Sequence, residues 1–198
     1  FPIEKLTHVT AADALKHPNW DMGAKITIDS ATMMNKGFEM IEAKWLYDVS
    51  EHDIEIVVHP QSIVHSMVEF KDGSVKAQLG LPDMRIPIRY ALGLPGRLAS
   101  ESKKMTVSDY ANLTFELPDY NKFPLLNTAY EAATRGGNAP CVMNAANEIA
   151  VAAFLQNKIK FIDIYKIIEQ TLAWAPFVEA PGYLDYVNSN AEARAFAA

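Results

Sequence analysis

Asp29-Ser-Ala-Thr-Met-Met-Asn-Lys-Gly-Phe-Glu39 is the stretch of sequence that decides the fold of the first half of the chain. From this stretch onward apolar residues return every three or four positions, which predicts an amphipathic helix over residues 31–47. On that helix Asn35, Lys36 and Glu39 lie within about 100° of arc, and the apolar side chains occupy the adjoining side. We therefore expect one face to be buried and another to present an amide, an ammonium and a carboxylate together.

Ser30 stands directly before this predicted helix, where unpaired backbone N–H groups and the positive end of the helix dipole favour anions. A hydroxyl, a helix N-terminus, the amide of Asn35 and the ammonium of Lys36 are donors suited to a phosphate. Glu39, one turn further on, is placed to ligate a metal ion beside that phosphate. Spacing alone favours a plainer interpretation, in which Ser30 is an N-cap and Lys36 and Glu39 belong to a solvated helix face.

A second candidate is the loop His17-Pro-Asn-Trp-Asp-Met-Gly23, which places aromatic and sulfur side chains between a proline and a glycine. Such a composition is typical of a lid that covers a ligand. In that case Trp20 excludes water and His17 donates a hydrogen bond to a substrate hydroxyl. A surface loop pinned by its tryptophan is an equal alternative.

Two histidines and the one cysteine of the chain are weaker candidates. His59 and His65 flank a Pro-Gln-Ser turn, but no cysteine or carboxylate completes a metal set, so we expect structural histidines. Cys141 has no histidine near it in sequence, and we expect it to be a small buried apolar residue. One cysteine also excludes an internal disulfide and a zinc site built from several thiolates.

The remaining pattern predicts an α/β fold followed by a helical bundle. We expect a helix from Thr10 to Lys16, strands over 25–28 and 54–58, and an antiparallel hairpin of 63–70 with 75–79 around the turn Lys71-Asp-Gly-Ser74. Prolines and glycines over 80–122 suggest a long connection. Helices follow over 124–135, 139–156 and 161–174, and a capping box at Ser189 and Glu192 predicts a last one.

We therefore predict three parts, in a mixed and partly antiparallel α/β class with a C-terminal α-helical bundle. They are an incomplete catalytic and dimerisation domain over 1–93, a linker over 94–119 and the bundle over 120–198.

A hydrophobic content of 49% is enough for a core. The net charge of -6 argues against nucleic acid or an anionic membrane as the main partner. No apolar run reaches the length of a membrane span. The chain begins at Phe1 rather than at a methionine, so we expect it to be processed, cut or incompletely observed.

Six motifs along essentially the whole chain resemble, in order and spacing, the 1-deoxy-D-xylulose 5-phosphate reductoisomerase family. They are His17-Pro-Asn-Trp-x-Met-Gly23, Lys25-Ile-x-x-Asp-Ser-Ala-Thr-Met-Met-Asn-Lys-Gly-x-Glu39, His59-Pro-Gln-Ser-x-x-His-Ser66, Gln78-Leu-Gly-x-Pro-Asp-Met-Arg85, Leu117-Pro-Asp-Tyr120 and Asn144-Ala-Ala-Asn-Glu148. The resemblance implies a skeletal rearrangement of 1-deoxy-D-xylulose 5-phosphate followed by reduction with NADPH. The product would be 2-C-methyl-D-erythritol 4-phosphate, in the non-mevalonate isoprenoid pathway. A divalent cation, Mg²⁺ or Mn²⁺, would act as a Lewis acid.

The resemblance also implies roles for individual residues. Ser30, Asn35 and Lys36 would hold the substrate phosphate, and Glu39 would ligate the metal and touch the substrate. Glu39 would thus be one of two catalytic residues.

The other implied roles fall on the loop and beyond it. His17 would be the second catalytic residue and would contact the substrate from a flap, with Trp20 and Met22 covering it. Gly23 would lie near the nicotinamide cofactor, and Met84 against its ring.

The sequence departs from the family pattern in what precedes these motifs. The Gly-rich fingerprint of the NADPH domain, the acidic pair that completes the metal site and a further phosphate-binding serine have no counterpart here. We therefore expect the 198-residue chain alone to be inactive. The family implies a homodimer in the bacterial cytoplasm or the plastid stroma. The alternative function is a non-catalytic sugar-phosphate-binding or assembly module of the same fold.

Overall fold

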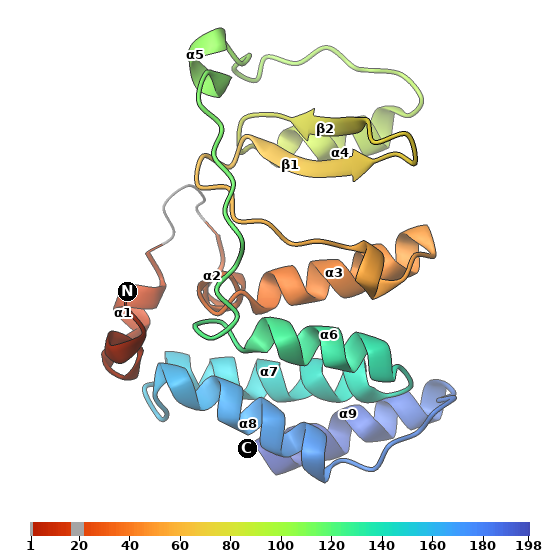
Figure 1. Ribbon diagram of the computed structural model, residues 1–198. Coiled ribbons are helices and arrows are strands. Elements are labelled where there is room, and N and C mark those ends of the chain that lie inside the picture. The colour runs from red at the N-terminus through yellow and green to blue at the C-terminus, as the bar shows by residue number, and fades with distance from the viewer. Residues whose placement is uncertain (1, 17–21) are drawn as a thin grey trace. The chain divides into compact units, whose positions relative to one another are not determined.

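The computed structural model describes residues 2–16 and 22–198, and these contain the helices and strands of Figure 1. The predicted roles of His17 and Trp20 lie outside the described residues. The elements are, in chain order, the 3-10 helix η1 (Ile3–His8), helices α1 (Ala11–Ala14), α2 (Ala24–Ala31) and α3 (Met34–Tyr47), the 3-10 helix η2 (Glu51–Asp53), strands β1 (Val64–Glu69) and β2 (Val75–Leu79), and helices α4 (Arg85–Gly93), α5 (Val107–Tyr110), α6 (Leu125–Arg135), α7 (Ala139–Leu155), α8 (Phe161–Trp174) and α9 (Tyr183–Ala197). None of the described helices is long and apolar enough to cross a bilayer.

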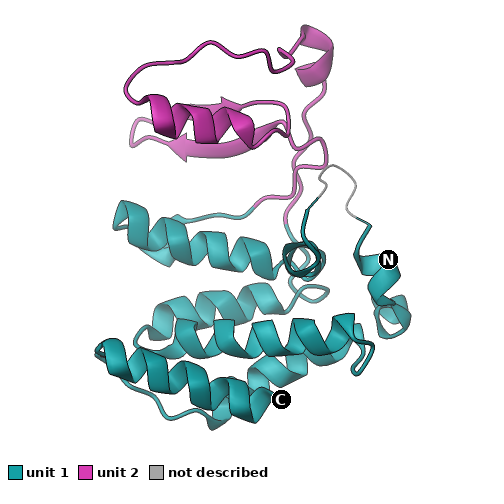
Figure 2. Cartoon of the chain, turned by 180° about the vertical axis from the view of Figure 1, so that it is seen from behind, with its two compact units in different colours: residues 1–56, 118–198 teal, residues 57–117 magenta. Residues whose placement is uncertain are grey.

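The chain forms two compact units, coloured separately in Figure 2. Unit 1 joins residues 1–56 to residues 118–198, and unit 2 consists of residues 57–117. The helices of the first fifty residues thus pack on the C-terminal helices, far away in sequence. A mixed α/β chain with a small antiparallel sheet confirms the predicted fold class. The division into domains at residues 93 and 120 stays a prediction, because packing within this chain alone does not define the domains of a longer one.

The core of unit 1 is built around α7, which runs between α6 on one side and α8 and α9 on the other (Figure 1). Four of its nine buried residues are alanines, and Ala145, Ala146 and Ala150 are fully enclosed. Small side chains on several faces of one helix allow neighbouring helices to approach it closely. Larger apolar side chains of the other helices, such as Ile164 and Ile168 of α8, fill the space between them.

The predicted strand over 25–28 is wrong, because these residues belong to helix α2. The β-branched run that suggested a strand instead buries Thr27 and Ile28 in unit 1, whose core includes both α2 and α7. The Thr27 hydroxyl donates to the carbonyl of Gly23 at 2.9 Å, a back-bond that a helix accommodates. Tertiary burial has overridden local strand propensity here.

The helix predicted over 31–47 is confirmed from Met34 onward, but it is not continuous with the residues before it. Met33 has a left-handed backbone with φ of 61°, and this residue separates α2 from α3. A non-glycine residue is uncommon in that region. We call residues 29–34 the elbow.

Unit 2 contains the predicted hairpin. Strands β1 and β2 pair antiparallel, and Gly73, with φ of 81°, occupies the turn where a side chain would be strained. The strand predicted over 54–58 is wrong, since only Val58 makes a bridge, with Glu116. The predicted connection over 80–122 contains a helix, α4, that the sequence did not predict. Pro87 lies in its first turn, where a missing backbone N–H breaks no helical hydrogen bond.

Helix ends near the two termini test the capping predictions. The helix predicted from Thr10 begins there with a capping box formed by Thr10 and Asp13, although α1 ends at Ala14 rather than at Lys16. The capping box predicted at Ser189 is wrong, because α9 already begins at Tyr183. Asp185 caps that helix by accepting the backbone N–H of Gly182 at 2.9 Å.

Two contacts fix α3 on the bundle. At Gly37 a Cβ would lie 2.6 Å from the Cβ of Ala129 in α6, so the two helices approach closely there. At the other end of α3, Lys44 donates to Glu51 at 2.6 Å and to the carbonyl of Ala133 at 3.0 Å. Thr134 donates to the same carboxylate at 2.8 Å. These donors, Lys44 first, lower the pKa of the buried Glu51 to about 2.

Gly37→Ala should destabilise the protein by about 1–3 kcal/mol, because the added methyl group overlaps α6. This loss should exceed the gain in helix propensity of about 1 kcal/mol. Thermal unfolding measures the difference. Gly182→Ala is the control, since its Cβ would meet its nearest neighbour at an ordinary 3.6 Å. A Gly37→Ala protein as stable as the wild type would show that α3 does not rest on α6 at this point.

Glu51→Gln should lower the free energy of unfolding at neutral pH by on the order of 2 kcal/mol, through the loss of charged hydrogen bonds. The ordinary pKa of 4.5 falls to about 2 on folding, so between these values the unfolded chain binds a proton that the folded chain lacks. Wild-type stability is therefore complete above pH 4.5 and declines below it. Urea unfolding at pH 7 and pH 3.5 should give a smaller difference between wild type and variant at the lower pH. An equal difference at both would contradict the assignment.

Candidate functional site

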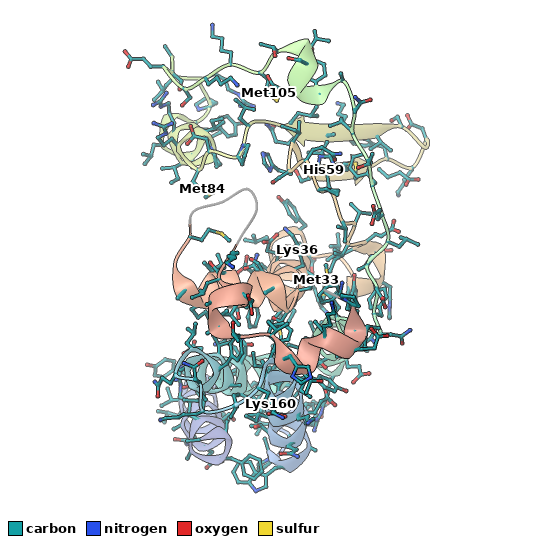
Figure 3. The ribbon with its side chains drawn as sticks, turned by 90° about the vertical axis from the view of Figure 1, so that its left-hand side faces the viewer. Met33, Lys36, His59, Met84, Met105 and Lys160 are labelled. Atoms are coloured by element: carbon teal, nitrogen blue, oxygen red, sulfur yellow. The ribbon has the colours of Figure 1, made fainter. Side chains whose placement is uncertain are left out.

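The first two turns of α3 carry the polar face that the sequence predicts. Asn35 donates its side-chain amide to Glu39 at 2.6 Å, and the Lys36 ammonium lies 2.5 Å from the other oxygen of the same carboxylate. Lys36 and Glu39 are each about half exposed, with 47% of the side chain accessible. Figure 3 labels Lys36 in this turn and Met33 in the elbow before it. The predicted sector of amide, ammonium and carboxylate is therefore confirmed as a contact group.

The electrostatic setting of this group comes from the helix itself. Because α3 begins at Met34, Asn35 and Lys36 stand in its first turn, where the helix dipole is positive. The Glu39 carboxylate, one turn on, accepts from both donors. A second anion brought to the same place would find an ammonium, an amide and a helix N-terminus, the donors that phosphate groups prefer.

The position predicted for Ser30 is wrong in one respect. Ser30 does not precede a helix N-terminus, because it is in the last turn of α2, and its hydroxyl donates to the carbonyl of Ile26 at 2.9 Å. Its own carbonyl accepts the N–H of Met33 at 3.1 Å, inside the elbow. The N-cap interpretation therefore fails, whereas its contact with a phosphate stays a prediction.

Sequence reasoning missed Asp29 and Asn147. Asp29 is buried, its carboxylate pairs with Lys25 at 2.6 Å, and it accepts the side-chain amide of Asn147 at 2.9 Å. The Lys25 ammonium also lies over the Phe38 ring of α3, with Nζ 5.0 Å from the ring centre. Both acid and amide stand inside motifs singled out from the sequence, but 118 positions separate them, so only the fold brings them together.

A shallow groove of about 390 Å³ lies beside this network in unit 1. Residues of α2, α3 and α7 line it, among them Lys25, Asp29, Asn35, Phe38 and Asn144. Asn144 donates to Glu148, which pairs with Arg194 of α9. The helix motif and the Asn144–Glu148 motif therefore meet at one surface, although they lie in different parts of the sequence.

The residues expected near a cofactor are only partly placed. Gly23 has an extended backbone and is the N-cap of α2, and its carbonyl accepts from Thr27. Met84 is exposed and stands directly before α4, in unit 2. Met22 is described but its predicted covering role stays a prediction, as do the cofactor contacts of Gly23 and Met84.

The histidines of unit 2 have structural contacts, as expected. His59 lies 2.8 Å from the carbonyl oxygen of Thr114 through Nδ1, and its ring stacks on Phe115 at 4.6 Å. His65 lies 3.1 Å from the carbonyl oxygen of Gly80 through Nε2. Cys141, half-buried on α7, donates weakly to a carbonyl, and burial raises the pKa of its thiol, so it lacks the features of a reactive thiolate.

The described residues do not by themselves fit a metal ion. No group of three histidine, cysteine or acidic side chains converges in residues 2–16 and 22–198. Glu39 supplies one carboxylate, whereas Mg²⁺ and Mn²⁺ take about six oxygen or nitrogen ligands. Any metal held by Glu39 needs further ligands from outside this part of the chain.

Comparison with known proteins gives a consistent result. A family described as the DXP reductoisomerase C-terminal domain matches residues 79–196, and one described as the 1-deoxy-D-xylulose 5-phosphate reductoisomerase C-terminal domain matches residues 1–47. The chain is 59% identical over 196 residues to the 1-deoxy-D-xylulose 5-phosphate reductoisomerase of Bacteroides thetaiotaomicron, covering 99% of this chain and 50% of the relative. The enzyme of Acetivibrio thermocellus is 58% identical over 169 residues, covering 85% of this chain and 44% of the relative.

Solved structures agree in fold. The reductoisomerase of Zymomonas mobilis in complex with NADPH superposes with a TM-score of 0.90 at 48% identity, covering 98% of this chain and 50% of that one. A DOX-P reductoisomerase in complex with NADPH, fosmidomycin and magnesium gives 0.90 at 42% identity, covering 100% of this chain and 50% of that one. The chain spans about half the length of the curated relatives it matches. It belongs to the 1-deoxy-D-xylulose 5-phosphate reductoisomerase family, in the portion covered by the C-terminal domains.

Proposed function

We propose that this chain is the substrate-binding and C-terminal part of a 1-deoxy-D-xylulose 5-phosphate reductoisomerase. The whole enzyme would convert 1-deoxy-D-xylulose 5-phosphate to 2-C-methyl-D-erythritol 4-phosphate by skeletal rearrangement and NADPH reduction. The observation that carries the proposal is the shared contact of Asn35, Lys36 and Glu39 on the first turns of α3. A sugar phosphate needs an ammonium and an amide donor close together, and this turn of α3 supplies both.

Asn35 and Lys36 would bind the phosphate, and Glu39 would contact the substrate or a metal. Lys36 and Asn35 donate to Glu39 when no other anion is present, and a substrate phosphate would compete for the same donors. Once the donors turn to the phosphate, the Glu39 carboxylate is free to reach the substrate or a metal. Ser30 would add a hydroxyl donor from the end of α2. We keep His17 as the second catalytic residue, on a flap with Trp20 and Met22.

The cofactors are proposed from the relatives. One solved relative is described in complex with NADPH, and another with NADPH, fosmidomycin and magnesium. NADPH would supply hydride, and Mg²⁺ or Mn²⁺ would supply Lewis acidity. Since this chain offers Glu39 as its one predicted metal ligand and only Gly23 and Met84 as cofactor contacts, it needs the other half of the enzyme to hold either group.

Other features remain proposals of the same kind. We propose a homodimer in the bacterial cytoplasm, with a catalytic and dimerisation domain over 1–93, a linker over 94–119 and a bundle over 120–198. The bacterial origin of the relatives supports the bacterial cytoplasm over the plastid stroma. The net charge of -6 supports a small-molecule substrate over nucleic acid or an anionic membrane.

Lys36→Ala in the full-length enzyme should raise KM for the sugar phosphate roughly tenfold to hundredfold, because a charge-assisted hydrogen bond to phosphate is lost. Steady-state kinetics measures the effect. Lys166→Ala is the matched control, since Lys166 pairs with Asp163 at the same three-residue spacing on α8. Unchanged KM and kcat in the Lys36 variant would show that Lys36 does not bind the substrate phosphate.

The purified 198-residue chain should not oxidise NADPH when given the sugar phosphate and Mg²⁺ or Mn²⁺. One carboxylate is too few ligands for the metal, and the chain has no Gly-rich dinucleotide fingerprint. Absorbance at the NADPH band follows the reaction, with a full-length enzyme as the positive control. Turnover by the chain alone would refute the proposal that metal and NADPH binding need the other half of the enzyme.

A further inference from the structure

Asp29 is an unusual residue to find at the end of α2. It is 2% exposed, and both of its carboxylate oxygens are engaged, one by Lys25 and the other by Asn147. A buried carboxylate is costly unless it is paired and hydrogen-bonded, so this arrangement depends on both partners.

Asn147 donates this hydrogen bond from a side chain that has no contact with solvent. It is fully buried on α7, and its amide must present the NH₂ group to Asp29, because a carboxylate only accepts. The amide oxygen is then enclosed with no partner among the described residues. Burying an unpaired oxygen opposes folding, so the hydrogen bond that Asn147 donates to Asp29 comes at a cost.

The contact between Asn147 and Asp29 lies at the start of the elbow, because Asp29 is its first residue. The backbone carbonyl of Asp29 accepts the hydroxyl of Thr32 at 3.1 Å, and that hydroxyl accepts the N–H of Met34 at 3.4 Å. Between them Met33 takes the left-handed conformation that sets the direction of α3. The side chain of Asp29 therefore anchors the segment whose next residues are Asn35 and Lys36.

We infer that Asn147 is a positioning residue for phosphate binding: through Asp29 it fixes the elbow, and thereby the orientation of the first turn of α3. This inference rests on the proposed function, since it concerns the same donors. Asn147 does not touch the substrate. Its effect is on the geometry of Asn35 and Lys36, so it should alter affinity for the sugar phosphate more than stability alone explains.

The test uses the full-length enzyme with Asn147→Leu, which keeps the branched shape and the number of side-chain heavy atoms but removes the amide. We expect KM for the sugar phosphate to rise roughly tenfold from misplaced donors. Asn147→Asp should be worse, because two carboxylates then face each other. The exchange Asp29→Asn with Asn147→Asp restores one acid and one amide and should bring KM back to within about threefold of wild type.

Thr128→Val controls for stability. Thr128 is buried on α6 and donates to Glu169 of α8 at 2.6 Å, away from the elbow. This variant should lower Tm while KM stays at the wild-type value. A role of Asn147 in stability alone predicts the same pattern for Asn147→Leu.

The outcomes separate the two proposals. A folded Asn147→Leu enzyme with wild-type KM overturns the inference if Lys36→Ala still raises KM, and the proposed function then stands. If Lys36→Ala leaves KM unchanged as well, the part of the proposed function that fails is the assignment of phosphate binding to the first turn of α3. Should Asn147→Leu not fold, the exchange variant decides: recovery of KM relative to Asn147→Asp supports the inference, and a KM as high as that of Asn147→Asp overturns it.

Discussion

The close approach of α3 to α6 at Gly37 is the contact on which the candidate site depends. A glycine at this point lets the helix lie against Ala129 with no room for another carbon. The same helix is held at its far end by the buried carboxylate of Glu51, which receives Lys44. Two fixed points define the axis of α3, and the polar face on its first turns is consequently presented by a rigid element rather than by a loop. Rigid support of this kind is what precise ligand geometry requires.

The polar face is predictable from the sequence and its support is not. Asn35 and Lys36 stand four and three positions before Glu39, so the helical repeat alone brings both donors to its carboxylate. Asp29 and Asn147 are 118 positions apart, and their contact exists only because α2 and α7 pack in one core. Local periodicity carries no information on such a pair. A single sequence therefore identified the donors but not the residues that orient them.

The fold divides in the same way. The hairpin turn over 71–74 and the long C-terminal helices follow from local chemistry, and they were predicted with the right type. The β-branched residues 26–28 suggested a strand, yet burial in the core of unit 1 made them helical. Pro87 suggested a connection, although the first turn of a helix accepts proline. Ser189 matched a capping pattern but lies within a helix that Asp185 had already capped. Each error arose where tertiary packing or position within a helix outweighed residue type.

We propose above all that the first turn of α3 binds the phosphate of the substrate. The most direct measurement is a crystal structure of the full-length enzyme with the sugar phosphate bound. We expect phosphate oxygens within about 3 Å of the Lys36 ammonium and the Asn35 amide, the usual range of a charge-assisted hydrogen bond, with Glu39 released from both. A phosphate bound elsewhere, with Lys36 and Asn35 still donating to Glu39, would contradict it.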